Sequence, residues 1–88
     1  MKEGKNRLFG LTGRVYTNKP LIEILGDHRL LIEHHKGVIQ YETNLISVKV
    51  NFGFVEVRGT ELTISCMSRE NLVICGKVDS VHLWKGSN

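Results

Sequence analysis

The chain has 88 residues, of which 41% are hydrophobic, and a formal net charge of +3. This length is enough for one hydrophobic core and too short for two, so we expect a single domain. No apolar run approaches the ~20 residues of a membrane-spanning helix, and the N-terminal residues lack the apolar stretch of a secretory signal. We therefore expect a soluble protein that stays inside the cell.

The basic charge is concentrated at the beginning of the chain. Residues 1–19 hold five basic residues and one acidic residue, whereas residues 20–88 hold seven basic and eight acidic residues. We expect a basic, partly disordered N-terminal segment, residues 1–19, followed by a nearly neutral β domain, residues 20–85. A basic segment can contact nucleic acid or an anionic membrane surface, so peripheral membrane contact stays open beside the simpler reading of a solvated terminus.

Short runs of Val, Ile, Leu and Thr, with no alanine anywhere in the chain, favour strands over helices. The alternation is clearest in residues 45–50, where Ile46, Val48 and Val50 should point inward. The expected strands are residues 21–25, 29–34, 38–42, 45–50, 54–58, 62–66, 72–75 and 77–84. Their close spacing predicts an all-β fold, namely a small antiparallel β-sandwich (immunoglobulin-like or a meander) of about seven to eight short strands.

Three local features refine this prediction. Gly37 can take the positive φ of a tight turn, so residues 29–34 and 38–42 are expected to pair as a hairpin. Residues 68–71 are expected to form a connection. The change of parity between Val78 and Val81 predicts a bulge near Asp79 and Ser80.

Side chains with catalytic or metal-binding chemistry form no recognisable site. Cys66 and Cys75 would lie on adjacent strands, but a protein inside the cell favours two reduced thiols over a disulfide. His34 and His35 are adjacent, so on a strand they would point to opposite faces and could not share a metal ion. The chain has no nucleophile motif, phosphate-binding loop or dinucleotide fingerprint. We expect no enzymatic activity, no cofactor and no bound metal.

Binding of single-stranded nucleic acid is the alternative function, because some small β domains stack bases on aromatic residues beside a basic groove. Phe52 and Phe54, with Lys49 and Arg58, could serve in this way. The strand region is close to neutral and its aromatic residues are few, so nucleic-acid binding is disfavoured. Phe54, which should point outward, fits contact with another protein better.

From Ile32 to Tyr41 the chain reads Ile-Glu-His-His-Lys-Gly-Val-Ile-Gln-Tyr. This segment resembles the pattern Ile-Glu-Asn-His-Arg/Lys-Gly-Ile-x-x-Tyr of the YabP/YqfC family of bacterial sporulation proteins, and the YqfC branch looks closest. His34 stands where the family usually has Asn, and both residues tolerate turn geometry. Further matching segments are residues 22–26, 53–59, 62–64 and 73–78.

The resemblance implies a non-enzymatic sporulation protein that acts as a small structural or adaptor module in endospore formation through protein contacts. It also implies a cytoplasmic location in a spore-forming bacterium, in the mother cell or peripherally at the forespore membrane. A YqfD-like membrane sporulation protein is a candidate partner, and a homo-oligomer is another way to use exposed strand edges. The candidate interface residues are Glu33, His35, Lys36, Gly37, Tyr41 and Phe54.

Overall fold

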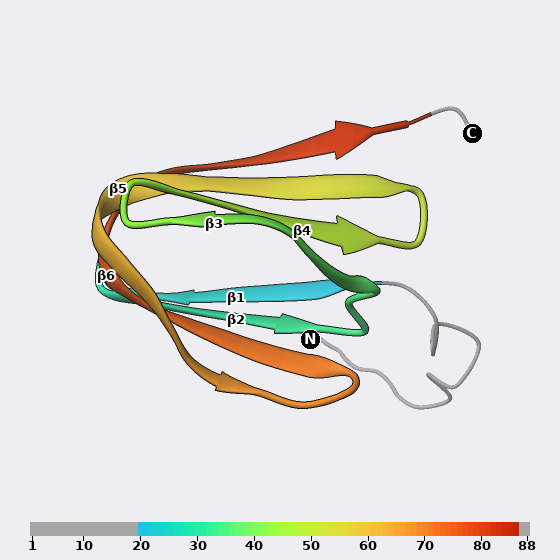
Figure 1. Cartoon of the computed structure of the whole chain (residues 1–88), viewed down its shortest axis with the longest axis horizontal. Helices are drawn as coiled ribbons and strands as arrows, with labels where there is room; N and C mark the ends of the chain where they lie inside the picture. The colour runs from blue at the N-terminus through green and yellow to red at the C-terminus, as the bar shows by residue number, and fades with distance from the viewer. Residues whose placement is uncertain (1–19, 87–88) are drawn as a thin grey trace, which may run out of the picture.

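The computed structural model describes residues 20–86 and contains six β-strands and no helix in that part of the chain (Figure 1). The expected basic segment, residues 1–19, lies outside the described residues. The strands are β1 (Leu21–Leu25), β2 (Arg29–Glu33), β3 (Gly37–Glu42), β4 (Leu45–Val50), β5 (Gly53–Met67) and β6 (Asn71–Lys85). All neighbouring pairs are antiparallel, and they form one open sheet in the order β1-β2-β6-β5-β4-β3.

The all-β prediction is confirmed, but the sandwich of seven to eight strands is not. Two expected interruptions between strands, at residues 59–61 and at Gly76, are instead bends within the 15-residue strands β5 and β6. These strands pair with each other on both sides of the bend, so the backbone ladder continues where the composition suggested an end. Gly76 has a φ of 127°, and a Cβ atom there would lie 2.5 Å from the Glu61 carbonyl oxygen. Glycine therefore permits the close approach of the two strands that the bend requires.

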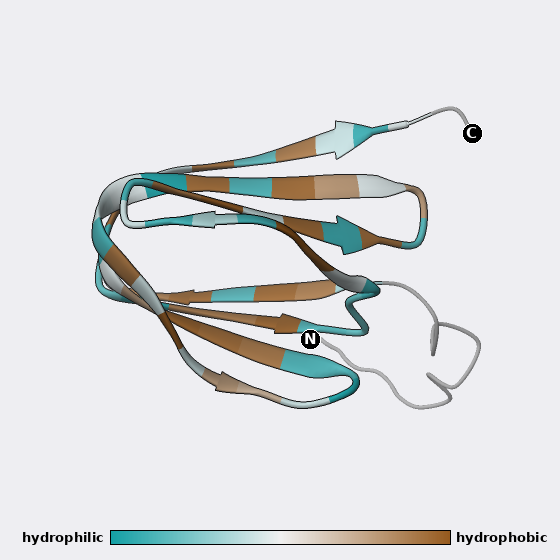
Figure 2. Cartoon of the chain, viewed as in Figure 1, coloured by the Kyte–Doolittle hydropathy of each residue, from teal (hydrophilic) through white to brown (hydrophobic). Residues whose placement is uncertain are grey.

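The bends fold the single sheet back on itself, so that its two halves enclose one core. β3, β4, the N-terminal half of β5 and the C-terminal half of β6 form one half, and the rest of the sheet forms the other (Figure 1). Figure 2 shows hydrophobic residues running through both halves. The fully buried side chains come from both: Leu30, Ile32, Ile46, Val48, Val50, Val55, Val57, Leu62, Leu72 and Ile74. Burying each such side chain contributes about 1.5–3 kcal/mol before the entropy cost of folding.

The inward positions expected in β4 are confirmed, because Ile46, Val48 and Val50 are all fully buried. The expected bulge is also present. Arg58 pairs with Ser80, and the next residue, Gly59, pairs with Val78, so Asp79 is the extra residue of β6. This irregularity lies beside the bend, where a bulge increases the local twist.

Two hairpin turns hold the bends in place. The Leu62 N–H donates to the Thr43 carbonyl oxygen in the turn between β3 and β4, at 2.7 Å. The Val78 N–H donates to the Asp27 carbonyl oxygen in the turn between β1 and β2, at 2.6 Å. Each half of the sheet is thus fastened to the bend by its own turn.

The expected hairpin between β2 and β3 is wrong. β2 pairs with β1 and β6, while β3 pairs only with β4 among the described strands. Residues 34–36 instead form a crossover from one half of the sheet to the other. His34 and Gly37 have φ values of 66° and 124°, and these positive angles turn the chain away from the plane of β2.

Candidate interaction surfaces

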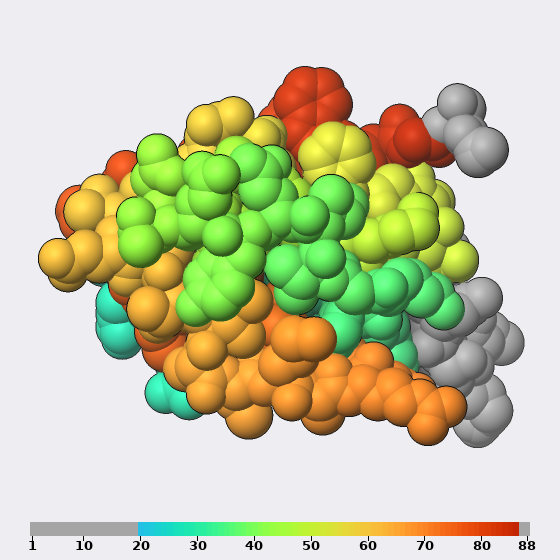
Figure 3. Space-filling model, viewed as in Figure 1, coloured from blue at the N-terminus to red at the C-terminus, as the bar shows by residue number. Residues whose placement is uncertain are grey.

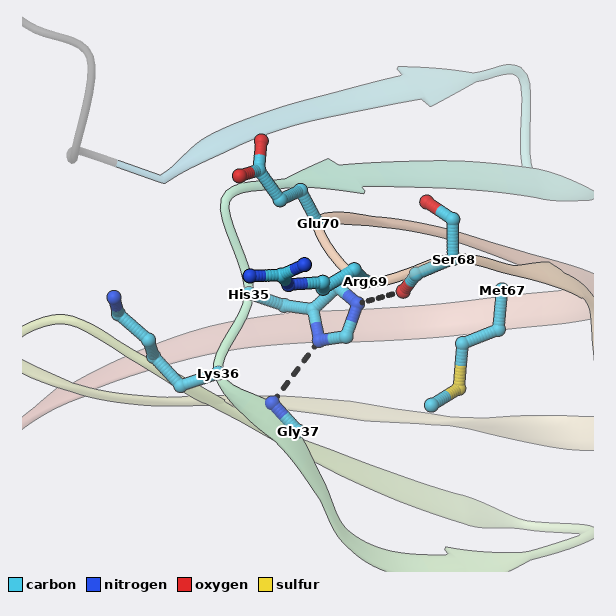
Figure 4. Close-up of a pocket in the computed structure, with 7 residues that line it drawn as sticks. All are labelled: His35, Lys36, Gly37, Met67, Ser68, Arg69 and Glu70. Atoms are coloured by element: carbon cyan, nitrogen blue, oxygen red, sulfur yellow. Dashed lines mark hydrogen bonds between the residues drawn. The ribbon is translucent and has the colours of Figure 1, made fainter.

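His35, in the crossover, holds the two halves of the sheet together. Its side chain is 6% exposed, and its Nε2 lies 2.9 Å from the carbonyl oxygen of Ser68 in the β5–β6 turn. The Gly37 N–H donates to its Nδ1 at 3.0 Å (Figure 4). A neutral ring with its proton on Nε2 satisfies both contacts. Because both nitrogens bind backbone groups, this ring is not placed to act as a base or a metal ligand.

The backbone of the crossover extends the sheet at both ends. The His34 and His35 N–H groups donate to the Glu70 carbonyl oxygen at 2.6 and 3.2 Å, and the Lys36 N–H donates to the Lys49 carbonyl oxygen at 2.7 Å. The N-terminal part therefore continues β2 beside β6, and the C-terminal part begins β3 beside β4. The crossover residues are ordered by the fold itself and need no ligand to position them.

An open hollow of about 480 Å³ lies between the crossover and the β5–β6 turn. Its lining consists of His35, Lys36, Gly37, Met67, Ser68, Arg69 and Glu70. In Figure 4 the Lys36 side chain extends away from the His35 ring. The Ser68 carbonyl oxygen lies beside Nε2 of that ring. The mixture of Lys36, Arg69 and Glu70 leaves no strong charge of one sign, so the hollow has no evident ligand class.

Tyr41 joins the edge of β3 to the other half of the sheet. Its side chain is 51% exposed, and its hydroxyl oxygen accepts a hydrogen bond from the Ile64 N–H at 2.9 Å. Atoms of β3 and of the C-terminal half of β5 meet on the face seen in Figure 3. Tyr41 therefore bridges two sheet edges while about half of its surface stays exposed to solvent.

Phe54 lies in an aromatic cluster on the outer face of β5 and β6. It stacks on Trp84 with ring centroids 6.2 Å apart, and His82 lies 4.2 Å from Trp84 on the same face. The Trp84 Nε1 donates to the Glu56 carboxylate at 2.9 Å. The outward direction expected for Phe54 is confirmed. Its partners His82 and Trp84 were missed, although they alternate with Val81 and Leu83 at strand spacing.

The six candidate interface residues do not form one continuous patch. His35, Lys36 and Gly37 lie together at the crossover, whereas Glu33 and Phe54 point outward from opposite halves of the folded sheet. The outer faces of the two halves look away from each other, so Glu33 and Phe54 lie on different faces of the protein. Their role in binding stays a prediction.

β1 forms an exposed, apolar edge that was not expected. Leu21, Ile24 and Leu25 are 47%, 51% and 58% exposed, and within residues 20–86 no strand pairs with the far side of β1. The segment Leu-Ile-Glu-Ile-Leu has apolar residues on both faces, a pattern typical of a strand buried on both sides. The sequence signal therefore existed, but it suggested a central strand instead of an edge.

The described residues show no metal-binding cluster. No group of three or more His, Cys, Asp or Glu side chains gathers in this part of the protein. Cys66 and Cys75 are both free, and the register places Cys66 opposite Val73 and Cys75 opposite Thr63. No helix in residues 20–86 could cross a membrane.

Comparison with known proteins identifies one family. The family model described as the YabP family matches residues 17–88, which include every strand of the structure. The search of curated proteins and the search of solved structures found no match. The chain belongs to the YabP family, and this membership suggests a sporulation-related role.

Proposed function

We propose that this YabP family protein is a non-enzymatic adaptor of endospore formation that acts by binding other proteins. The observation that carries the proposal is the apolar edge of β1, where three large aliphatic side chains are about half exposed or more. Exposed apolar groups gathered at an edge mark contact sites, because water solvates them poorly and a partner can cover them.

Two other sheet edges, β3 and the C-terminal half of β5, are less suited than β1 to binding a partner. β3 has a register shift between Val38 and Gln40, and the C-terminal half of β5 has one between Ile64 and Cys66. Such irregularities interrupt the regular row of backbone groups that an added strand would need. The β1–β2 register has no shift along its five pairs. β1 is thus the most regular and the most apolar of these edges.

The finer parts of the proposal concern the partner and the location. We propose membership of the YqfC branch, which the sequence resembles most within the family. The proposed partner is a YqfD-like membrane sporulation protein, and the proposed location is the cytoplasm of the mother cell, at the forespore membrane. A small module with one apolar edge is suited to bridging a membrane protein and a soluble one. Nucleic-acid binding is not favoured, since residues 20–86 carry seven basic and eight acidic side chains.

A capture experiment from sporulating cells tests the proposal. The bait proteins are the full chain, a variant with Leu21→Thr and Leu25→Thr, and a control with Ile39→Thr on the β3 edge, where the side chain is 57% exposed. We expect the full chain and the control to retain the same partner and the β1 variant to lose it. Equal loss in both variants, or equal retention in both, would overturn the assignment to β1.

A further inference from the structure

The free edge of β1 presents a defined set of backbone groups. The Gly76 N–H donates to the His28 carbonyl and the His34 N–H donates to the Glu70 carbonyl, so the even-numbered residues of β2 face β6. In an antiparallel ladder successive residues direct their backbone groups to opposite sides. Residues 29, 31 and 33 therefore face β1, and their partners 21, 23 and 25 face β2. The N–H and C=O groups of Ile22 and Ile24 consequently point to the free edge.

The side chains at this edge divide between two faces. Ile22 packs against the core, and Ile24 lies beside it on the same inner face, opposite the buried Leu30. Glu23 lies on the outer face between Leu21 and Leu25. A strand added to β1 would therefore place alternate residues against an isoleucine pair and against a carboxylate.

Charge makes a second copy of this chain a poor occupant. The antiparallel pairing of two β1 strands with the longest overlap places Ile22 opposite Ile24 and Glu23 opposite Glu23 of the other copy. Like charges directly opposite each other destabilise a strand pair. Shifting the pairing so that Ile22 faces Ile22 puts Ile24 opposite Pro20, which has no N–H to donate.

Charge also indicates which occupant fits. Glu23 is exposed and is a diagonal neighbour of Glu33 on the outer face, and neither forms an ion pair within residues 20–86. Arg29, the other diagonal neighbour, lies next to the β1–β2 turn. A lysine or arginine opposite Glu23 would face its carboxylate directly, and apolar residues on either side of it would cover Ile22 and Ile24.

We propose that β1 binds an extended segment of a partner protein as a seventh, antiparallel strand, with a basic residue opposite Glu23 and an apolar residue on each side of it. This inference rests on the proposed adaptor function and specifies the chemistry of its partner. Backbone hydrogen bonds to Ile22 and Ile24 provide affinity, and Glu23 provides selectivity.

Short peptides test whether an added strand pairs with β1 in the proposed register. The probe is the fluorescently labelled peptide Thr-Val-Lys-Val-Thr, with capped ends, titrated into the full chain and followed by fluorescence anisotropy. Its two valines face Ile22 and Ile24, so N-methylation of either valine removes a donor to β1 and should abolish binding. N-methylation of the lysine removes an N–H that points away from β1, and binding should remain within about twofold. Equal effects of the three methylations would overturn the strand-addition geometry.

Charge exchange tests the role of Glu23. A matched peptide with glutamate in place of lysine should bind about tenfold more weakly, and the Glu23→Lys variant should reverse this preference. Glu23 is exposed, so the exchange should leave the fold intact, as thermal unfolding can verify. Light scattering should show a monomer in the absence of peptide. A dimer that dissociates when the lysine peptide is added would overturn the proposal in favour of a second copy.

The failure of this inference can be distinguished from the failure of the proposed function. If the lysine peptide does not bind while the leucine substitutions in β1 abolish capture from cells, strand addition is refuted and the adaptor function stands. If neither experiment depends on β1, strand addition and the assignment of the partner site to β1 are both refuted. If the full chain captures no partner at all, the adaptor function is refuted as well.

Discussion

The first and last strands of the sheet order, β1 and β3, are both edges, but they make different contacts with the rest of the fold. β3 follows the crossover anchored by His35, and its Tyr41 hydroxyl accepts a hydrogen bond from Ile64 in the opposite half. β1 is tied to the sheet by its pairing with β2 and exposes Leu21, Ile24 and Leu25. Position at an edge thus does not decide the role of a strand. Contacts across the fold make β3 part of the scaffold, and their scarcity leaves the apolar edge of β1 exposed.

The largest expected effect comes from His35→Ala at the start of the β3 edge. The substitution removes both ring contacts, leaves the Ser68 carbonyl and the Gly37 N–H without partners, and opens a cavity. We expect a loss of about 3 kcal/mol in the free energy of unfolding, measured by urea denaturation. The exposed His28→Ala is the control and should cost less than about 0.5 kcal/mol. Equal losses in the two variants would show that His35 does not anchor the crossover.

Gly37→Ala is expected to have the next largest effect. The space around Gly37 is open, but its φ of 124° is a conformation that residues with a side chain rarely adopt. Strain alone should therefore cost about 1–3 kcal/mol, measured in the same way. Gly86→Ala is the control, because Gly86 has no positive φ and its nearest neighbour to an added Cβ lies 3.8 Å away. A neutral Gly37→Ala would mean that the crossover can adopt another path.

Tyr41→Phe should have a smaller effect, because it removes one exposed hydrogen bond and keeps the ring. The loss of stability should be about 0.5–1 kcal/mol. The sharper measurement is amide hydrogen exchange, in which the Ile64 N–H should exchange faster and the buried strand β4 should not change. Faster exchange throughout β4 would mean that the hydroxyl stabilises the whole fold and not just the junction of two edges.

The smallest effect is expected at β1. Leu25→Thr changes a side chain that is 58% exposed on the outer face, and threonine suits a strand. Stability should change by less than about 0.5 kcal/mol in urea denaturation, while partner capture falls. If Leu25→Thr cost as much stability as His35→Ala, the contrast between the two edges would be lost and β1 would be part of the scaffold.

Local pattern predicted much of the fold. The boundaries of β1 and β4 agree with the structure, the connection at residues 68–71 overlaps the β5–β6 turn, and the parity change in β6 located its bulge. These features depend on neighbouring residues, because a strand's side chains alternate wherever one face is buried. The same reasoning placed Phe54 outward, which the stacking on Trp84 confirms.

The predictions that the structure contradicts share a cause. The expected strands stop at Gly59 and at Gly76, because glycine commonly ends strands, yet here the two glycines allow two long strands to bend together. Gly37 was interpreted as a hairpin turn because its positive φ suits one, yet β6 occupies the edge of β2 that β3 would need. In each case the local backbone conformation agrees with the sequence. Pairing with a strand far away in the chain determines the secondary-structure element to which the residue belongs.

The sequence by itself determined that this chain is all β, which side chains of residues 45–50 face the core, and that it resembles a sporulation family. These properties follow from periodicity and from residue patterns that are local in the chain. Only the tertiary structure decided that the sheet is single and folded, that His35 joins its halves, and that β1 is an exposed edge. Strand order is set by pairings between residues far apart in sequence, and an apolar strand looks the same in sequence whether a neighbour covers it or not.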